Sequence, residues 1–120
     1  MAISLTSMIE YAPKYGGNSE GEKPTVFHIK IMGAHVYRQL LADAKLALAG
    51  DTALTPEFIE LYRRAVSERV IQIDGLEIDG EPIRTGAEFY DHPAIPEEFL
   101  KEIENAVVRH PKISEADSKN

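Results

Sequence analysis

An acidic repeat at residues 73–90, IDGLEIDGEPIRTGAEFY, holds the side chains that most resemble a chemical site. Two copies of Ile-Asp-Gly lie five residues apart, and carboxylates beside glycine turns are typical of calcium loops. An EF-hand loop needs acidic ligands at its first and twelfth positions and glycine at its sixth. With Gly80 sixth, glycines occupy the first and twelfth positions, and with Gly75 sixth the first is Val70. Both registers fail, which leaves an irregular calcium loop as the alternative.

The same repeat has a structural interpretation that we favour. Asp-Gly is a strong turn signal because aspartate tolerates, and glycine prefers, the positive φ of tight hairpin turns. The pairs at 74–75 and 79–80 therefore predict two turns between short strands over about 70–83. Pro82 lacks an N–H, so residues 81–83 form either an edge strand or no strand.

Other catalytic or cofactor chemistry has no clear candidate. The four histidines lack a close metal-ligand spacing, and the chain has no cysteine for a thiolate site or a disulfide. The sequence contains no Gly-x-Ser-x-Gly elbow, dinucleotide fingerprint or phosphate loop. The pair Glu97-Glu98 is better explained by a helix N-terminus than by acid–base work. We predict no catalytic residue, no metal ligand, no cofactor and no enzyme activity.

Negative charge is concentrated in one segment. The net charge is −7, and residues 74–104 hold ten acidic and two basic side chains. Such a field repels phosphate, so we expect no nucleic-acid partner. The acidic surface is explained either by solubility or by recognition of a basic partner. No apolar stretch approaches the ~20 residues of a membrane span, so we expect a soluble, cytoplasmic protein.

The elements that must position these side chains follow from hydrophobic periodicity. At 120 residues the chain fits one domain, which we predict to be α+β. Phe27, Ile29 and Ile31 alternate with polar residues as in a half-buried strand. The predicted elements are a strand at 25–32, an amphipathic helical hairpin at 34–49 and 56–69, short strands at 70–83, a short helix opened by a Thr85–Glu88 capping box, and a closing helix at about 96–110.

The two ends are predicted to lie outside the globular domain at 25–110. Residues 1–24 are rich in glycine and proline, which predicts a flexible arm without a regular element. Residues 111–120 are too polar to bury a face and predict a disordered tail. Three larger apolar side chains of the arm leave docking on the domain or on a partner open: Ile9, Tyr11 and Tyr15.

The order of these parts is more informative than any one motif. An arm (YAPKYGGN), a strand running into a helix (PTVFHIKIMGAHVYRQLL), a second helix, RVIQIDGLEIDGEPIRTGAEFY and IPEEFLKEIENAV follow one another, with residues 69–107 the most telling part. This arrangement resembles the small tail assembly chaperone proteins of tailed bacteriophages and prophages. The resemblance implies a non-enzymatic protein in the cytoplasm of a bacterial host, which binds the long helical tape-measure protein during tail assembly.

A chaperone for an amphipathic helical partner needs an exposed apolar groove with a charged rim. We therefore take Tyr37, Tyr62 and Phe89 as candidate partner-binding residues, although apolar stripes of this kind form core more often than binding surface. Two alternatives remain: a minor structural component of the phage tail or head–tail joint, and an acidic regulatory protein that binds a basic host partner.

Overall fold

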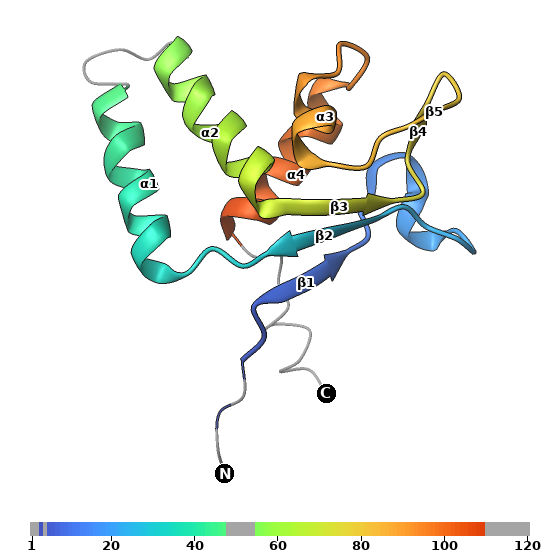
Figure 1. Ribbon diagram of the computed structural model, residues 1–120, viewed down its shortest axis with the longest axis horizontal. Helices are drawn as coiled ribbons and strands as arrows, with labels where there is room; N and C mark the ends of the chain where they lie inside the picture. Colours follow the sequence, from blue (N-terminus) through green and yellow to red (C-terminus); the bar gives the residue numbers. More distant parts are fainter. Residues whose placement is uncertain (1–2, 4, 48–54, 110–120) are drawn as a thin grey trace.

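The computed structural model describes residues 3, 5–47 and 55–109, and it confirms an α+β domain with two small antiparallel sheets (Figure 1). In chain order the elements are β1 (Met8–Tyr11), the 3-10 helix η1 (Tyr15–Glu20), β2 (Val26–Lys30), α1 (Ala34–Ala47), α2 (Pro56–Arg69), β3 (Val70–Asp74), β4 (Glu77–Ile78), β5 (Glu81–Pro82), α3 (Gly86–Asp91) and α4 (Glu97–Arg109). The predicted tail at 111–120 lies outside the described residues.

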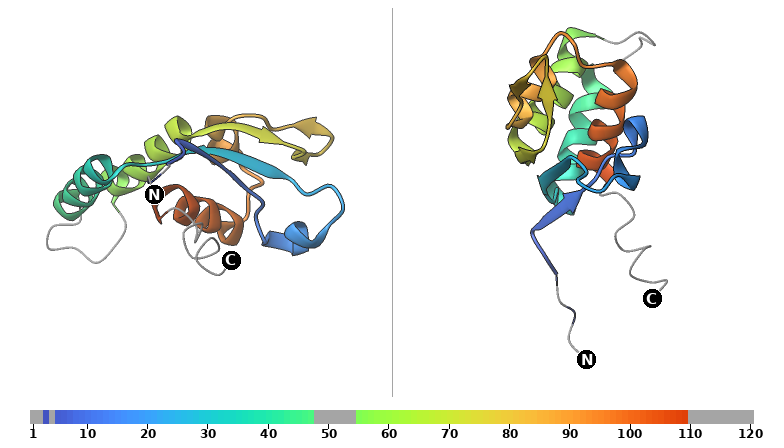
Figure 2. Two further views of the ribbon diagram at one scale, coloured as in Figure 1. Left: turned by 90° about the horizontal axis from the view of Figure 1, so that it is seen from below. Right: turned by 90° about the vertical axis from the view of Figure 1, so that its right-hand side faces the viewer.

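The larger sheet has the order β1-β2-β3, and both pairings are antiparallel. Alternation along β2 buries Phe27 and Ile29 completely and leaves Lys30 exposed on the other face. A register shift between His28 and Ile29 interrupts the pairing with β3. The sheet therefore has one apolar face toward the core, and α4 lies against it (Figure 2).

The N-terminal segment differs from its prediction. We expected no regular element over residues 1–24, but Met8–Tyr11 form β1 and pair with β2. Ile9 is only 7% exposed, and the ring of Tyr15 stacks on Phe99 with centroids 4.8 Å apart. The prediction that the domain starts at residue 25 is therefore wrong. The physical reason is that a four-residue strand depends on its non-local partner and carries little local signal.

The acidic repeat forms turns, as its Asp-Gly pairs predict. Asp79 and Gly80 have φ of 53° and 82°, and they join β4 to β5 as a two-residue hairpin in which both central residues need positive φ. Gly75, with φ of 81°, follows β3, and its carbonyl accepts a hydrogen bond of 2.8 Å from the Thr25 hydroxyl. Pro82 lies in a strand that pairs on one side only.

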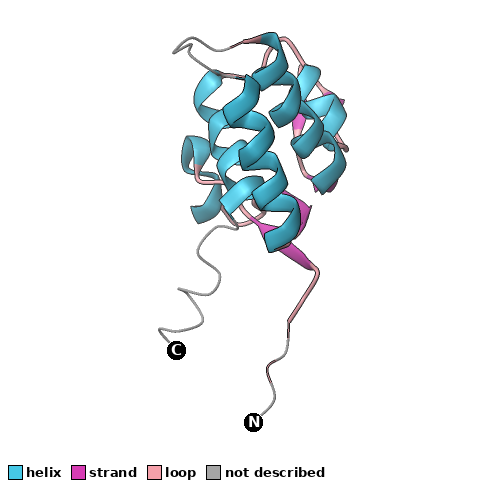
Figure 3. Ribbon diagram, turned by 90° about the vertical axis from the view of Figure 1, so that its left-hand side faces the viewer, coloured by secondary structure: helices cyan, strands magenta, loops and turns pink. Residues whose placement is uncertain are grey.

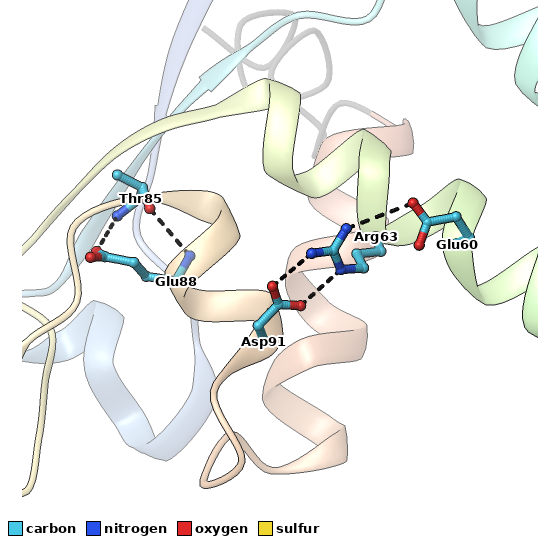
Figure 4. A network of polar contacts seen from close by, with 5 residues as sticks. All are labelled: Glu60, Arg63, Thr85, Glu88 and Asp91. Carbon is cyan, nitrogen blue, oxygen red and sulfur yellow. Dashed lines mark hydrogen bonds and ion pairs between the residues drawn. The ribbon is translucent and has the colours of Figure 1, made fainter.

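The predicted starts of the helix at 56–69 and of the short helix at Thr85 are confirmed. The Thr55 hydroxyl accepts from the Phe58 N–H at 3.1 Å at the start of α2. At α3 the Thr85 hydroxyl accepts from the Glu88 N–H at 3.2 Å, and a carboxylate oxygen of Glu88 accepts from the Thr85 N–H, also at 3.2 Å (Figure 4). This reciprocal pair satisfies two backbone donors that the first turn of a helix leaves unpaired.

The predicted helical hairpin is present, with α1 and α2 side by side at one end of the molecule (Figure 1). From the side of α1, the helices form the front of the molecule and the sheet lies behind them (Figure 3). The predicted end of the first helix at residue 49 lies outside the described residues. The element that α1 mainly packs against is α2.

An aromatic cluster lies at the centre of the core. Phe27, Phe89 and Phe99 meet edge to face, with ring centroids 5.0 to 5.9 Å apart. This geometry is favourable for aromatic rings and brings together β2, α3 and α4. In the part of the chain that the structure describes, every buried side chain is apolar.

Candidate functional site

The helical hairpin leaves several large apolar side chains in contact with solvent. Val36, Leu41 and Leu46 of α1 are 39%, 40% and 76% exposed, and Ile59 of α2 is 43% exposed. The side chains of α1 are exposed because α1 packs mainly on α2 and not on the sheet, so the described residues leave part of its apolar surface uncovered. Val36 and Leu46 line hollows beside α1, and Ile59 lines a different hollow.

Two adjoining hollows of about 280 and 430 Å³ lie between α1 and α2, and together we call them the α1–α2 groove. They share Leu61 and Arg64 of α2 and Asp43 of α1. Its apolar lining also includes Val36 and Leu40. Among the described residues, its charged lining consists of four carboxylates and two arginines.

A further hollow of about 460 Å³ lies between α2 and α4, and we call it the α2–α4 groove. Ile59 and Tyr62 line it from α2, and Leu100 lines it from α4. The ring of Tyr62 lies against that of Phe58, with centroids 5.0 Å apart. The polar lining residues are Tyr90, Glu97, Lys101, Glu104 and Asn105.

Glu104 is the unusual polar residue of the α2–α4 groove. It is partly buried, and its Oε2 accepts a hydrogen bond of 3.1 Å from the Tyr90 hydroxyl. Burial raises the pKa of this carboxyl above its ordinary value, and the nearby charge of Glu97 acts in the same direction. Within the described residues Glu104 makes no ion pair within 4.0 Å.

Several acidic side chains of residues 74–104 accept hydrogen bonds within the fold. Asp91 pairs with Arg63 through two hydrogen bonds of 2.9 and 2.8 Å, which join α3 to α2 (Figure 4). Glu102 accepts from the Tyr11 hydroxyl and from two backbone N–H groups before and within η1. Three more of the ten acids also accept hydrogen bonds: Asp74, Glu88 and Glu104. Much of the negative charge therefore has a structural role.

The three predicted partner-binding residues have different environments. Tyr62 lines the α2–α4 groove, whereas Tyr37 is partly buried and packs against the core. Phe89 is 0% exposed, so its assignment as a surface contact is wrong. The capping box starts α3 in a register that directs Phe89 between Phe27 and Phe99.

Sequence reasoning did not assign Ile59, Leu100 or Glu104 to a site. Ile59 and Leu100 belong to the apolar stripes of their helices, and the stripe alone does not tell which of its residues a neighbouring element covers. Glu104 looks like any other helical glutamate in the sequence. Its partial burial depends on the approach of α2 and α3 to α4.

Across residues 5–47 and 55–109 no group of three or more histidine, aspartate or glutamate side chains is placed to hold a metal ion. None of the described helices combines the length and the apolar character needed to cross a membrane. Comparison of the chain with protein-family models, curated proteins and solved structures returns no match.

Proposed function

We propose that the protein is a non-enzymatic tail assembly chaperone of a tailed bacteriophage or prophage, which binds the tape-measure protein during tail assembly. The observation that carries this proposal is the pair of apolar grooves on the two sides of α2. The family-like order of strand, helices, Asp-Gly turns and closing helix supports the same function. The protein acts without a cofactor in the cytoplasm of the bacterial host.

The grooves suit a helical partner in size and in chemistry. The α4 residues that line the α2–α4 groove extend from Glu97 to Asn105, which is about 12 Å at about 1.5 Å per residue. A groove of that length can receive an amphipathic helix through apolar side chains spaced at i, i+3 or i+4, and i+7. Covering this stripe keeps it from associating with other copies of the partner. Because the grooves lie on the surface, a helix can enter and leave without unfolding the chaperone.

Co-expression tests the proposal. The chain is produced together with the tape-measure protein of the same phage or prophage, and the soluble fraction is compared with that of the tape-measure protein alone. We expect the tape-measure protein to stay soluble and to co-purify with this chain in the absence of nucleotide and added metal. An equally insoluble tape-measure protein in both cultures contradicts the proposal.

The two alternatives give different results in the same system. A minor structural component remains bound to purified mature particles, which immunoblotting of the particles detects. A regulator of a basic host protein is instead recovered with a host nucleic-acid-binding protein. The ion pair of Asp91 with Arg63 leaves less free negative charge for that second role.

A further inference from the structure

The two grooves have a similar balance of charge, and they differ in one partly buried carboxylate of the α2–α4 groove. Four carboxylates and two arginines line the α1–α2 groove among the described residues. Among the described residues, the α2–α4 groove is lined by two carboxylates, Glu97 and Glu104, and by one cation, Lys101. A groove with this balance favours an apolar partner that also carries positive charge.

Glu104 has hydrogen-bonding capacity that the fold does not use. An ionised carboxylate offers about four acceptor positions on its two oxygens. In the described residues the one hydrogen bond to Glu104 comes from Tyr90, and it goes to Oε2. The other oxygen, Oε1, receives no hydrogen bond there, although the side chain is partly buried beside Leu100 and Tyr62 of the groove. A cationic donor that entered the groove would find this oxygen available.

This inference rests on the proposed function. We propose that the α2–α4 groove is the docking site for an amphipathic helical segment of the partner. A lysine or arginine beside the apolar stripe of that segment pairs with Glu104. Ile59 and Leu100 contact the apolar stripe from opposite walls. Glu104 lies one helical turn beyond Leu100 on α4. The partner's cation therefore lies about one turn from an apolar anchor.

The same carboxylate has a cost in the free protein. Burial raises the pKa of Glu104, so holding it ionised at neutral pH lowers the stability of the fold. Glu104→Gln removes the charge and keeps an oxygen that can accept from Tyr90. We therefore expect this variant to be as stable as the wild type or more stable at pH 7, and to bind the partner less tightly. A purely structural role would not separate the two measurements in this way.

The test uses overlapping synthetic peptides of about 20 residues that cover the tape-measure protein, since this length spans the groove at about 1.5 Å per residue. Peptides that bind the wild-type protein are titrated against Glu104→Gln and Ile59→Ser. Two matched controls accompany them. Glu98→Gln removes an exposed glutamate at the start of the same helix, and Leu41→Ser changes an apolar side chain of α1 that lines neither groove and has nearly the exposure of Ile59. Val36→Ser is a separate probe of the α1–α2 groove.

Loss of a hydrogen bond to a charged group predicts that Glu104→Gln weakens binding by roughly tenfold or more. Ile59→Ser should also weaken binding, while both controls stay within about twofold of the wild type. Replacing the basic residue of the peptide by glutamine should then make the Glu104→Gln variant and the wild type bind alike, as a double-mutant cycle requires.

Two results overturn the inference in different ways. If Val36→Ser abolishes binding while Glu104→Gln and Ile59→Ser do not, the docking site is the α1–α2 groove and the proposed function stands. If no peptide binds the wild type and the full-length tape-measure protein does not co-purify with it, the function and the inference both fail. Circular dichroism checks the fold of each variant, and the conservative Glu104→Gln decides the outcome if Ile59→Ser unfolds.

Discussion

Gly86, the first residue of α3, is the position where one added methyl group should do the most damage. A Cβ built there would lie 2.4 Å from the carbonyl oxygen of Val66 and 2.8 Å from the Cβ of Val70. The first of these neighbours is backbone at the end of α2, so it cannot move aside as a flexible side chain could. The glycine thus allows α3 to approach the junction of α2 and β3 closely.

The magnitude follows from two opposing effects. Alanine is favoured over glycine in a helix by up to about 1 kcal/mol, which alone would stabilise Gly86→Ala. Relief of the 2.4 Å contact requires a shift of about 1 Å to reach ordinary van der Waals separation. In a close-packed interior such overpacking costs about 1–3 kcal/mol or more. We expect the second effect to win, with a net loss of about 2 kcal/mol.

Urea unfolding followed by far-UV circular dichroism measures this loss. For a denaturant dependence of about 1–3 kcal/mol/M, the midpoint should fall by roughly 1 M. Gly33→Ala is the matched control, because its added Cβ meets no heavy atom within 4 Å. Its free energy of unfolding should change by less than about 1 kcal/mol. A Gly86→Ala midpoint at or above that of the wild type would refute the packing argument.

Three further predictions concern the core, pH and metal binding. Phe89→Ala should lower the free energy of unfolding by about 3–5 kcal/mol, because the ring is fully buried; a fold of unchanged stability in urea contradicts this. Backbone N–H groups hold the pKa of Glu88 below its ordinary value of 4.5, so its contribution is present above pH 4.5 and is lost as the pH falls further. Glu88→Gln should therefore flatten the acid side of the stability curve, and an unchanged slope argues against this assignment. Calorimetric titration with Ca²⁺ should reveal no site tighter than roughly millimolar at the Asp-Gly turns, whereas a micromolar site would restore the calcium-loop alternative.

Elements with local signals could be predicted from the sequence. The second helix was predicted at 56–69 and is found there, because threonine, proline and an early acid mark its start. The Asp79-Gly80 hairpin and the capping box of α3 depend on neighbouring residues in the same way. Each of these features is fixed within a few positions along the chain.

Features that depend on distant residues could not be predicted. β1 exists because Ile9 meets Ile29 across the sheet, and no local pattern of the glycine-rich arm indicates that pairing. The same holds for the site: Phe89 is core and Ile59 is exposed, although both belong to apolar stripes. Only the packing of α3 and α4 on their neighbours decides which side chains remain open to a partner.

Hydrogen–deuterium exchange of this chain, alone and in its co-purified complex with the tape-measure protein, tests the central claim most directly. If the partner docks in the α2–α4 groove, amides of α2 and α4 should exchange more slowly in the complex, while those of the β4–β5 hairpin should not change. Slower exchange confined to the β4–β5 hairpin, with α2 and α4 unchanged, would contradict docking in the α2–α4 groove. It would favour an acidic surface that binds a basic partner.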